Sequence, residues 1–196
     1  MSGPETDNAV FVAAMDLQAF CTERQWPFCF IGGLAVARWA VPRFTEDADM
    51  TLLTQFVHDE EYAAALLMRF SARRADALEF ALRYRVVPLR HENGVEMDVA
   101  LGALDFEEGA IQRASWWTTK SGGRLFTCSA EDLVVHKAFA SRDQDWLDVE
   151  SVMTTQRRHL NIGQILAELR PLAELKEDAG IVPRLEKMIR HQVYRP

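Results

Sequence analysis

Two short segments of this chain alternate strictly between polar or acidic and apolar residues, and this alternation restricts the fold more than any other feature. The first segment is DADMTL at residues 47–52, and the second is VEMDV at residues 95–99. Successive side chains of a β-strand point to opposite faces, so each segment gathers its acids on one face. Both segments are therefore predicted to be strands that bury one face in a core and present carboxylates on the other.

The remaining pattern predicts a mixed sheet with helices. Asn93-Gly94 lies between two strand-like runs, which is typical of a hairpin turn, and Ser129 with an acid three residues later is typical of a helix start. Helices are expected at 8–22, 34–40, 59–82, 130–141, 144–156, 161–177 and 182–193, and further strands at 28–31, 83–90 and 124–128. The expected fold class is α+β: a mixed β-sheet flanked by helices over residues 1–128, with a C-terminal helical portion over 129–196 packed on that core.

The charge distribution excludes one class of function. The chain has 29 acidic and 22 basic residues and a net charge of −7, yet residues 151–196 carry 8 basic and 5 acidic residues. Nonspecific binding to nucleic acids depends on Lys and Arg that neutralise phosphates, so a general nucleic-acid coat is excluded. The acidity of the first three-quarters leaves open that some carboxylates bind divalent cations.

Other bulk features predict a cytoplasmic protein that does not enter a membrane. No apolar run approaches the roughly 20 residues needed to span a bilayer, and residues 1–8 lack the basic start of a signal peptide. The three cysteines are odd in number and widely spaced, as expected of reduced thiols. The five histidines are scattered, which argues against a zinc site.

The acids of the two alternating segments predict a metal site. Asp47 and Asp49 share one face of their strand and repel each other unless a cation joins them. Mg²⁺ suits such hard oxygen ligands and is usually held by one or two carboxylates together with substrate phosphates. If the two strands are neighbours, Asp98 adds a third carboxylate, and three acids can hold two ions.

Gly32-Gly33 is predicted to form a tight turn between a buried strand and a helix. Without Cβ atoms, the backbone there can approach a phosphate closely. The helix that follows presents N–H donors and the positive end of its dipole to that phosphate. The glycine pair therefore suggests a phosphate cradle beside the acids.

These motifs, in this order, make the chain resemble the nucleotidyltransferase superfamily with the DNA polymerase β-like fold, and more narrowly the AbiEii-type nucleotidyltransferases, which include toxins. The resemblance covers residues 28–153. It rests on Gly32-Gly33, on Arg43-x-Thr45-x-Asp47-x-Asp49, on Asp98, on Lys137 in a later helix, and on the segment from Arg142 through Asp145 to Asp148.

The resemblance implies transfer of a nucleoside monophosphate from an NTP to an acceptor hydroxyl, with release of pyrophosphate. Asp47 and Asp49 would bind Mg²⁺, and Asp98 would bind metal or act as the base, with two ions in the active complex. Nucleotide binding is implied for Gly32, Gly33, Arg43, Thr45 and Lys137. One of Asp145 and Asp148 would hold Lys137 or position the acceptor, with Arg142 in support.

Each of these assignments has a simpler interpretation. Lys137 taken alone is a solvent-facing lysine, and Arg43 is the partner of Glu46 in a surface ion pair. Asp145 and Asp148 are three residues apart on a helix, where a solvated face with a surface pair to Arg142 explains them equally well.

The acceptor is left open between tRNA and a small molecule such as an antibiotic hydroxyl. A tRNA-modifying toxin leaves room for a cognate antitoxin as partner. A different class of function is a nucleotide-binding or interaction module on the same fold, without turnover.

Overall fold

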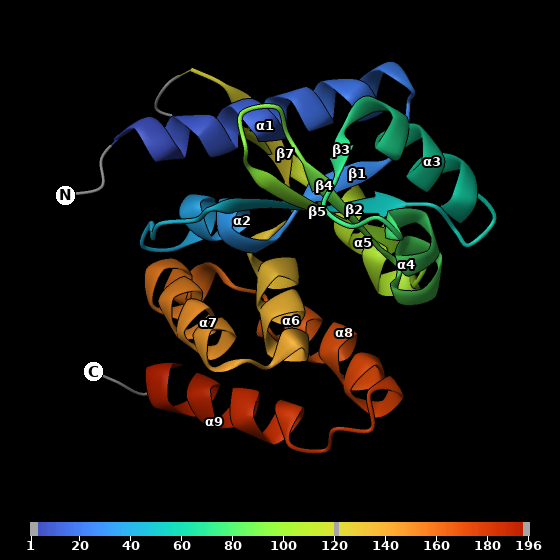
Figure 1. Cartoon of the computed structure of the whole chain (residues 1–196). Helices are drawn as coiled ribbons and strands as arrows, with labels where there is room; N and C mark the ends of the chain where they lie inside the picture. Colours follow the sequence, from blue (N-terminus) through green and yellow to red (C-terminus); the bar gives the residue numbers. More distant parts are fainter. Residues whose placement is uncertain (1–3, 120–121, 194–196) are drawn as a thin grey trace. The chain divides into compact units, whose positions relative to one another are not determined.

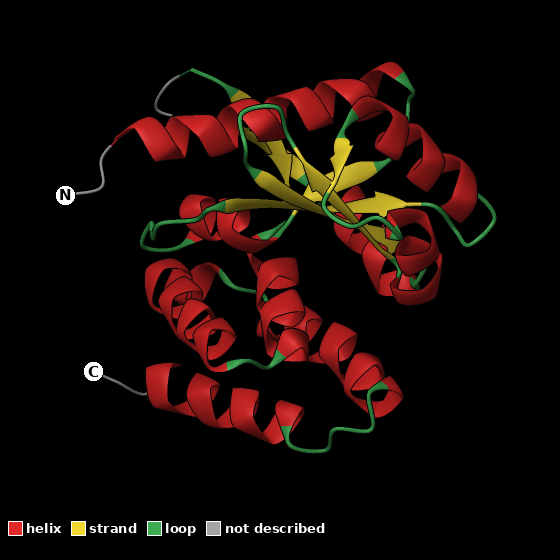
Figure 2. Cartoon of the chain, in the orientation of Figure 1, coloured by secondary structure: helices red, strands yellow, loops and turns green. Residues whose placement is uncertain are grey.

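The computed structural model describes residues 4–119 and 122–193 and divides the chain into two compact units. The first unit comprises Met1–Leu34 and Phe44–Cys128, and the second comprises Ala35–Arg43 and Ser129–Pro196. Strands occur only in the first unit among the residues described (Figure 2). The α+β class with a mixed sheet flanked by helices is confirmed.

The first unit is built on a seven-stranded sheet with the order β3-β4-β5-β2-β1-β7-β6. The strands are β1 (Phe28–Phe30), β2 (Asp47–Leu53), β3 (Ser71–Ala72), β4 (Val86–Arg90), β5 (Glu96–Gly102), β6 (Ser115–Thr118) and β7 (Arg124–Thr127). The helices are α1 (Pro4–Glu23), α2 (Gly32–Trp39), which continues into the second unit, α3 (Asp59–Arg69), α4 (Ala77–Tyr84) and α5 (Asp105–Gln112).

The two alternating segments lie next to each other at the centre of this sheet. Strand β2 pairs with β5 in parallel, and β4 pairs with β5 antiparallel, as the Asn93-Gly94 turn predicts. The apolar face carries Ala48, Met50, Met97 and Val99, all fully buried. Helices α1 and α3 cover that face and contribute Leu17 and Leu66 to its core, while α5 lies on the other side of the sheet (Figure 1).

The expected helix at 59–82 is wrong, because the chain interrupts it. Phe70 takes an extended conformation after α3, and Ser71 and Ala72 then pair with Arg90 and Leu89 of β4. Sheet pairing outweighs the local helical pattern here. The interruption matters for the site, because it sets Arg73 beside β4, where its N–H donates to Pro88 O at 3.0 Å.

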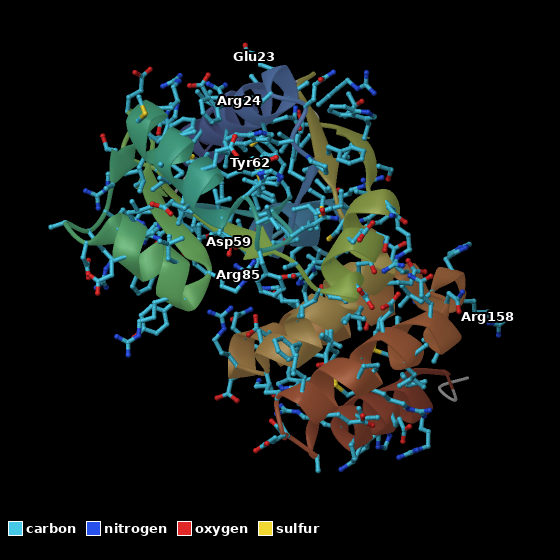
Figure 3. The ribbon with its side chains drawn as sticks, turned by 90° about the vertical axis from the view of Figure 1, so that its right-hand side faces the viewer. Glu23, Arg24, Asp59, Tyr62, Arg85 and Arg158 are labelled. Carbon is cyan, nitrogen blue, oxygen red and sulfur yellow. The ribbon has the colours of Figure 1, made fainter. Side chains whose placement is uncertain are left out.

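Arg85 links helices α3 and α4 to strand β5. It ends α4 with a left-handed backbone conformation, φ 58°. Its guanidinium donates to Asp59 of α3 and to the Leu101 carbonyl of β5, and Figure 3 labels Asp59 and Arg85 side by side. One partly buried ion pair thus ties two helices to strand β5.

The second unit is helical throughout its described part. It contains α6 (Ala130–Ala140), α7 (Asp143–Gln156), the 3₁₀ turn η1 (Arg157–His159), α8 (Ile162–Leu175) and α9 (Ile181–Val193). The predicted start of α6 is confirmed, since the Ser129 hydroxyl accepts from the Asp132 N–H at 3.0 Å. Fully buried Leu133, Val149 and Leu169 belong to its core. None of the helices in the described ranges combines the length and the apolar character that crossing a bilayer requires.

Candidate active site

The carboxylates of β2 and β5 lie on the face of the sheet opposite the apolar core. The parallel register places Asp49 beside Asp98 and Asp47 beside Glu96. Their strand neighbours Ala48 and Met97 are fully buried on the other face, so the pleat keeps all four acids together on one surface. The condition for a third carboxylate, that the two acidic strands are neighbours, is thus met in the structure.

The glycine pair packs directly against these side chains. Gly32 is the first residue of α2 and has φ +57°, and a Cβ there would lie 1.9 Å from Asp49 Oδ2. A Cβ on Gly33 would lie 2.2 Å from the Thr45 hydroxyl oxygen, which donates to Asp47 Oδ1 at 2.9 Å. Both glycines are therefore required for the acids and the start of α2 to meet.

Replacing Gly32 with Ala is expected to weaken both folding and nucleotide binding. The left-handed backbone costs a residue with a Cβ about 1–2 kcal/mol, and the new methyl group would also displace the Asp49 carboxylate. Gly94→Ala is the matched control, because Gly94 has φ +91° with nothing within 4 Å of its Cβ position. Urea unfolding should show losses for both variants, whereas titration with NTP should show loss for Gly32→Ala alone. Equal nucleotide affinity of the two variants would contradict the packing argument.

Arg73 is a site residue that the sequence pattern does not reveal, because it falls within the segment expected to be helical. Its guanidinium donates to Glu96 Oε2 at 2.6 Å and to Asp98. Hydrogen bonding from Arg90 and the charge of Arg73 hold the pKa of Glu96 below its usual value. The acid face therefore has a cationic border on the β4 side.

The donor set suits Mg²⁺ held jointly with a substrate. Asp47 and Asp49 are carboxylates two residues apart on one strand, and Mg²⁺ typically takes one or two carboxylates plus phosphate oxygens. Asp98 is engaged by Arg73. Within the described ranges, no group of three or more His, Cys, Asp or Glu side chains is arranged to hold an ion by itself. The three-acid, two-ion set thus stays a prediction.

The second unit brings the remaining predicted residues together in one cluster, in which Lys137, Asp145 and Asp148 are buried and Arg142 is exposed. Lys137 of α6 donates to Asp145 Oδ1 at 3.1 Å and lies 2.9 Å from Asp148 Oδ2. Arg43 forms a two-pronged pair with Asp148 at 2.8 and 2.9 Å, and Arg142 pairs with Asp145 at 2.7 Å. The five side chains form a continuous network of alternating charge.

The solvated-face interpretation of Lys137, Asp145 and Asp148 is wrong, whereas the expected pair between exposed Arg142 and Asp145 is confirmed. Lys137 is 7% exposed, Asp145 1% and Asp148 2%, so none of them belongs to a solvated face. Arg43 contacts Asp148 rather than the neighbouring Glu46. Both aspartates, not one, hold Lys137. Burial by itself would raise the pKa of Asp145 and Asp148, but the bonds from their Arg partners and from Lys137 outweigh burial and lower both values. The predicted contact between Lys137 and nucleotide phosphates stays a prediction.

His136 makes the stability of the second unit depend on pH. Burial lowers its pKa to about 4, against the raising effect of Asp132. The folded state therefore favours neutral His136. The protein keeps its full stability with respect to this group above pH 6.5 and loses it as the pH falls towards 4. The loss by pH 4 should be about 3 kcal/mol. Urea midpoints should fall less on acidification in His136→Gln than in the wild type, with exposed His159→Gln as control; identical pH profiles for all three would contradict this assignment.

Comparisons with known proteins agree with the geometry of the first unit. No family model and no curated protein matches the sequence. The solved structure of the antibiotic-resistance factor ANT(2'')-Ia is similar with a TM-score of 0.55 and 14% identity, covering 94% of this chain and 99% of that one. A nucleotidyltransferase-like antigenic protein from Paracoccidioides brasiliensis follows at 0.49 and 15%, covering 98% and 95% of the two chains. The lincosamide adenylyltransferase LnuA, solved with lincomycin, follows at 0.45 and 12%, covering 70% and 92%.

The chain has the nucleotidyltransferase fold. Its acidic strand pair follows the predicted order, while Gly32 and Gly33, expected to form a turn before the helix, are instead the first residues of α2. The likeness to ANT(2'')-Ia shows the fold alone. The narrower resemblance to AbiEii-type proteins stays a prediction.

Proposed function

We propose that the protein is a Mg²⁺-dependent nucleotidyltransferase that moves a nucleoside monophosphate from an NTP to an acceptor hydroxyl. The observation that carries the proposal is the contact between Asp49, which lies in register with Asp98, and Gly32 at the start of α2. Carboxylates for a metal and a glycine helix start for phosphates thus meet at one point. The β2–β5 register places the two acids side by side, and the hydrogen bond from the Ile31 N–H to Asp49 O at 2.9 Å holds the start of α2 next to them.

Each site residue of the first unit has a defined role in this proposal. The backbone N–H groups at Gly32 and Gly33 bind the triphosphate at the positive end of α2. Asp47 and Asp49 hold Mg²⁺, which supplies charge neutralisation on the phosphates when bound. Thr45 fixes Asp47 through its hydroxyl. Asp98 faces the acceptor side and takes the hydroxyl proton, so that most of the rate enhancement comes from positioning and electrostatics.

A second candidate function is a nucleotide-binding module without turnover. The ion pair between Arg73 and Asp98 favours it, because Asp98 is then occupied by a permanent structural partner. Such a module would bind NTP but release no pyrophosphate. An antibiotic-type acceptor is compatible with the fold, whereas a tRNA acceptor, a toxin role and an antitoxin partner stay predictions.

The test is incubation of the protein with labelled NTPs, Mg²⁺ and a panel of acceptors that contains total RNA and aminoglycoside and lincosamide antibiotics. The wild type should label one acceptor class and release pyrophosphate, and Asp47→Ala/Asp49→Ala should do neither. NTP binding without pyrophosphate release across the panel would favour the binding module. The same absence of label in both proteins, without NTP binding, would rule out both candidates.

A further inference from the structure

A hollow of about 400 Å³ adjoins the acid face on its β4 side, and nothing in the sequence pattern assigns it a role. It is lined by Arg73 and Arg74 from the link between β3 and α4, by Pro88 and Arg90 of β4, and by Asp98 of β5. Its volume lies within the range of about 300–1,000 Å³ for small-ligand pockets. The hollow therefore has room for a group of nucleotide size.

The sheet order places this hollow next to the proposed nucleotide site. On strand β5, Asp98 is in register with Asp49 of β2 on one side and with Pro88 of β4 on the other. All three side chains belong to the same face of the sheet. The Asp98 carboxylate therefore separates the triphosphate side, at Asp49 and Gly32, from the hollow. A group seated in the hollow reaches Asp98 from the side opposite the nucleotide, as an acceptor must.

Among the residues that line the hollow the cations outnumber the carboxylates, although Arg74 is also paired at 2.9 Å with Asp76, which does not line it. Three guanidinium groups, from Arg73, Arg74 and Arg90, line it together with the carboxylates of Glu96 and Asp98. Arg90 pairs with Glu96 at 3.0 Å and is half exposed. Exposed pairs of this kind, that of Arg74 with Asp76 included, are weak because water screens both charges, so a stronger anion can replace them.

Two further details favour an anion with several oxygens. The Arg74 guanidinium stacks over the Phe80 ring, 4.3 Å from its centroid, which holds it at the wall of the hollow. The buried Nε of Arg73 has no hydrogen-bond partner in the described part of the chain, so one donor remains for a ligand. Arginine binds phosphate through two parallel hydrogen bonds, which makes phosphate the matching group.

We propose that this hollow is the acceptor site and that the acceptor carries a phosphate group close to the hydroxyl that is modified. The proposal rests on the proposed function. In the reaction, the acceptor oxygen bonds to the α-phosphorus of the NTP, the bond from that phosphorus to the bridging oxygen breaks, and its electron pair leaves with pyrophosphate. The hydroxyl proton passes to Asp98, which Arg73 leaves to pair with the acceptor phosphate. A polycationic acceptor such as an aminoglycoside would meet like charges here.

The test uses AMP and a fluorescein-labelled RNA decanucleotide as phosphate-bearing probes, and kanamycin as a cationic one. Arg74→Gln/Arg90→Gln should weaken binding of a phosphate-bearing probe at least tenfold and lower kcat/KM for it similarly, while NTP affinity stays at the wild-type level. For RNA, the dependence of affinity on salt should also become shallower. Arg24→Gln/Arg83→Gln removes the same charge from exposed positions outside the hollow and should behave as wild type.

The outcomes separate this proposal from the proposed function. AMP labelling alone would indicate a small phosphorylated acceptor, and RNA labelling alone a nucleic-acid acceptor; both support the site. Labelling of kanamycin would overturn the acceptor site, even when NTP is bound and used. The same conclusion would follow if Arg74→Gln/Arg90→Gln bound and labelled the phosphate-bearing probes as well as the wild type does. Absence of binding by both phosphate probes would overturn it as well. Absence of NTP binding, with probe binding that still depends on the two arginines, would overturn the proposed function and leave the phosphate site standing.

Discussion

Asp49→Asn is expected to lower the rate of nucleotidyl transfer about 1000-fold, which corresponds to about 4 kcal/mol of transition-state stabilisation. The amide keeps the size of the side chain and therefore its fit against Gly32. It removes the negative charge that would hold Mg²⁺ at the phosphates. The measurement is the rate of pyrophosphate release at saturating NTP over a series of Mg²⁺ concentrations.

The control for this prediction is Glu92→Gln, which changes charge equally in the exposed turn between β4 and β5. It should keep the wild-type rate, and both variants should unfold at the wild-type urea concentration. A rate for Asp49→Asn within tenfold of the wild type would show that the carboxylate at this point of β2 has no part in the reaction.

Lys137→Met is expected to destabilise the protein by about 3 kcal/mol. Removing one partner of a buried ion pair leaves uncompensated charge, which typically costs 3–5 kcal/mol. The lower end applies here because Asp148 keeps Arg43 and Asp145 keeps Arg142 as partners. Urea unfolding at pH 7, followed by circular dichroism, measures the change.

The matched control is Lys187→Met on α9, where the side chain is exposed and the loss should stay within 0.5 kcal/mol, as is typical of surface substitutions. Adding Asp145→Asn to Lys137→Met should restore part of the stability, because it removes one of the two acids left without the lysine. A loss below 1 kcal/mol for Lys137→Met, or a further loss in the double variant, would contradict the network.

Strict alternation made the centre of the sheet predictable from the sequence. In residues 47–52 and 95–99, only one orientation of each strand buries Met50 and Val99 and keeps the acids on the other face. The observed strands have this orientation. The turn at Asn93-Gly94 was equally predictable, since its backbone requirement is local. The alternation of polar and apolar residues and the local sequence of the turn were therefore enough to predict the central strands of the first unit.

The break at residues 70–76 was not predictable, because its cause is distant in sequence. Ser71 and Ala72 become a strand only because β4 offers them an edge. Arg73 consequently comes to Asp98, and no spacing rule relates these two residues. The hollow beside Asp98 also depends on this break, because Arg73 and Arg74 line it.

The environment of Lys137 was also beyond local reasoning. Its partners Asp145 and Asp148 lie on the next helix, and Arg43 lies about a hundred residues earlier in the chain. Only tertiary packing brings these charges together in a buried position. The family resemblance identified the residues, but the pairing of both aspartates with one lysine required the structure.

The most direct test of the central claim is a comparison of NTP labelled on the α-phosphate with NTP labelled on the γ-phosphate, in the presence of Mg²⁺ and the acceptor panel. Nucleotidyl transfer predicts that the α label appears on the acceptor while the γ label leaves as pyrophosphate. Transfer of the γ label to the acceptor, or release of the γ label as orthophosphate without any α label on an acceptor, would contradict the account.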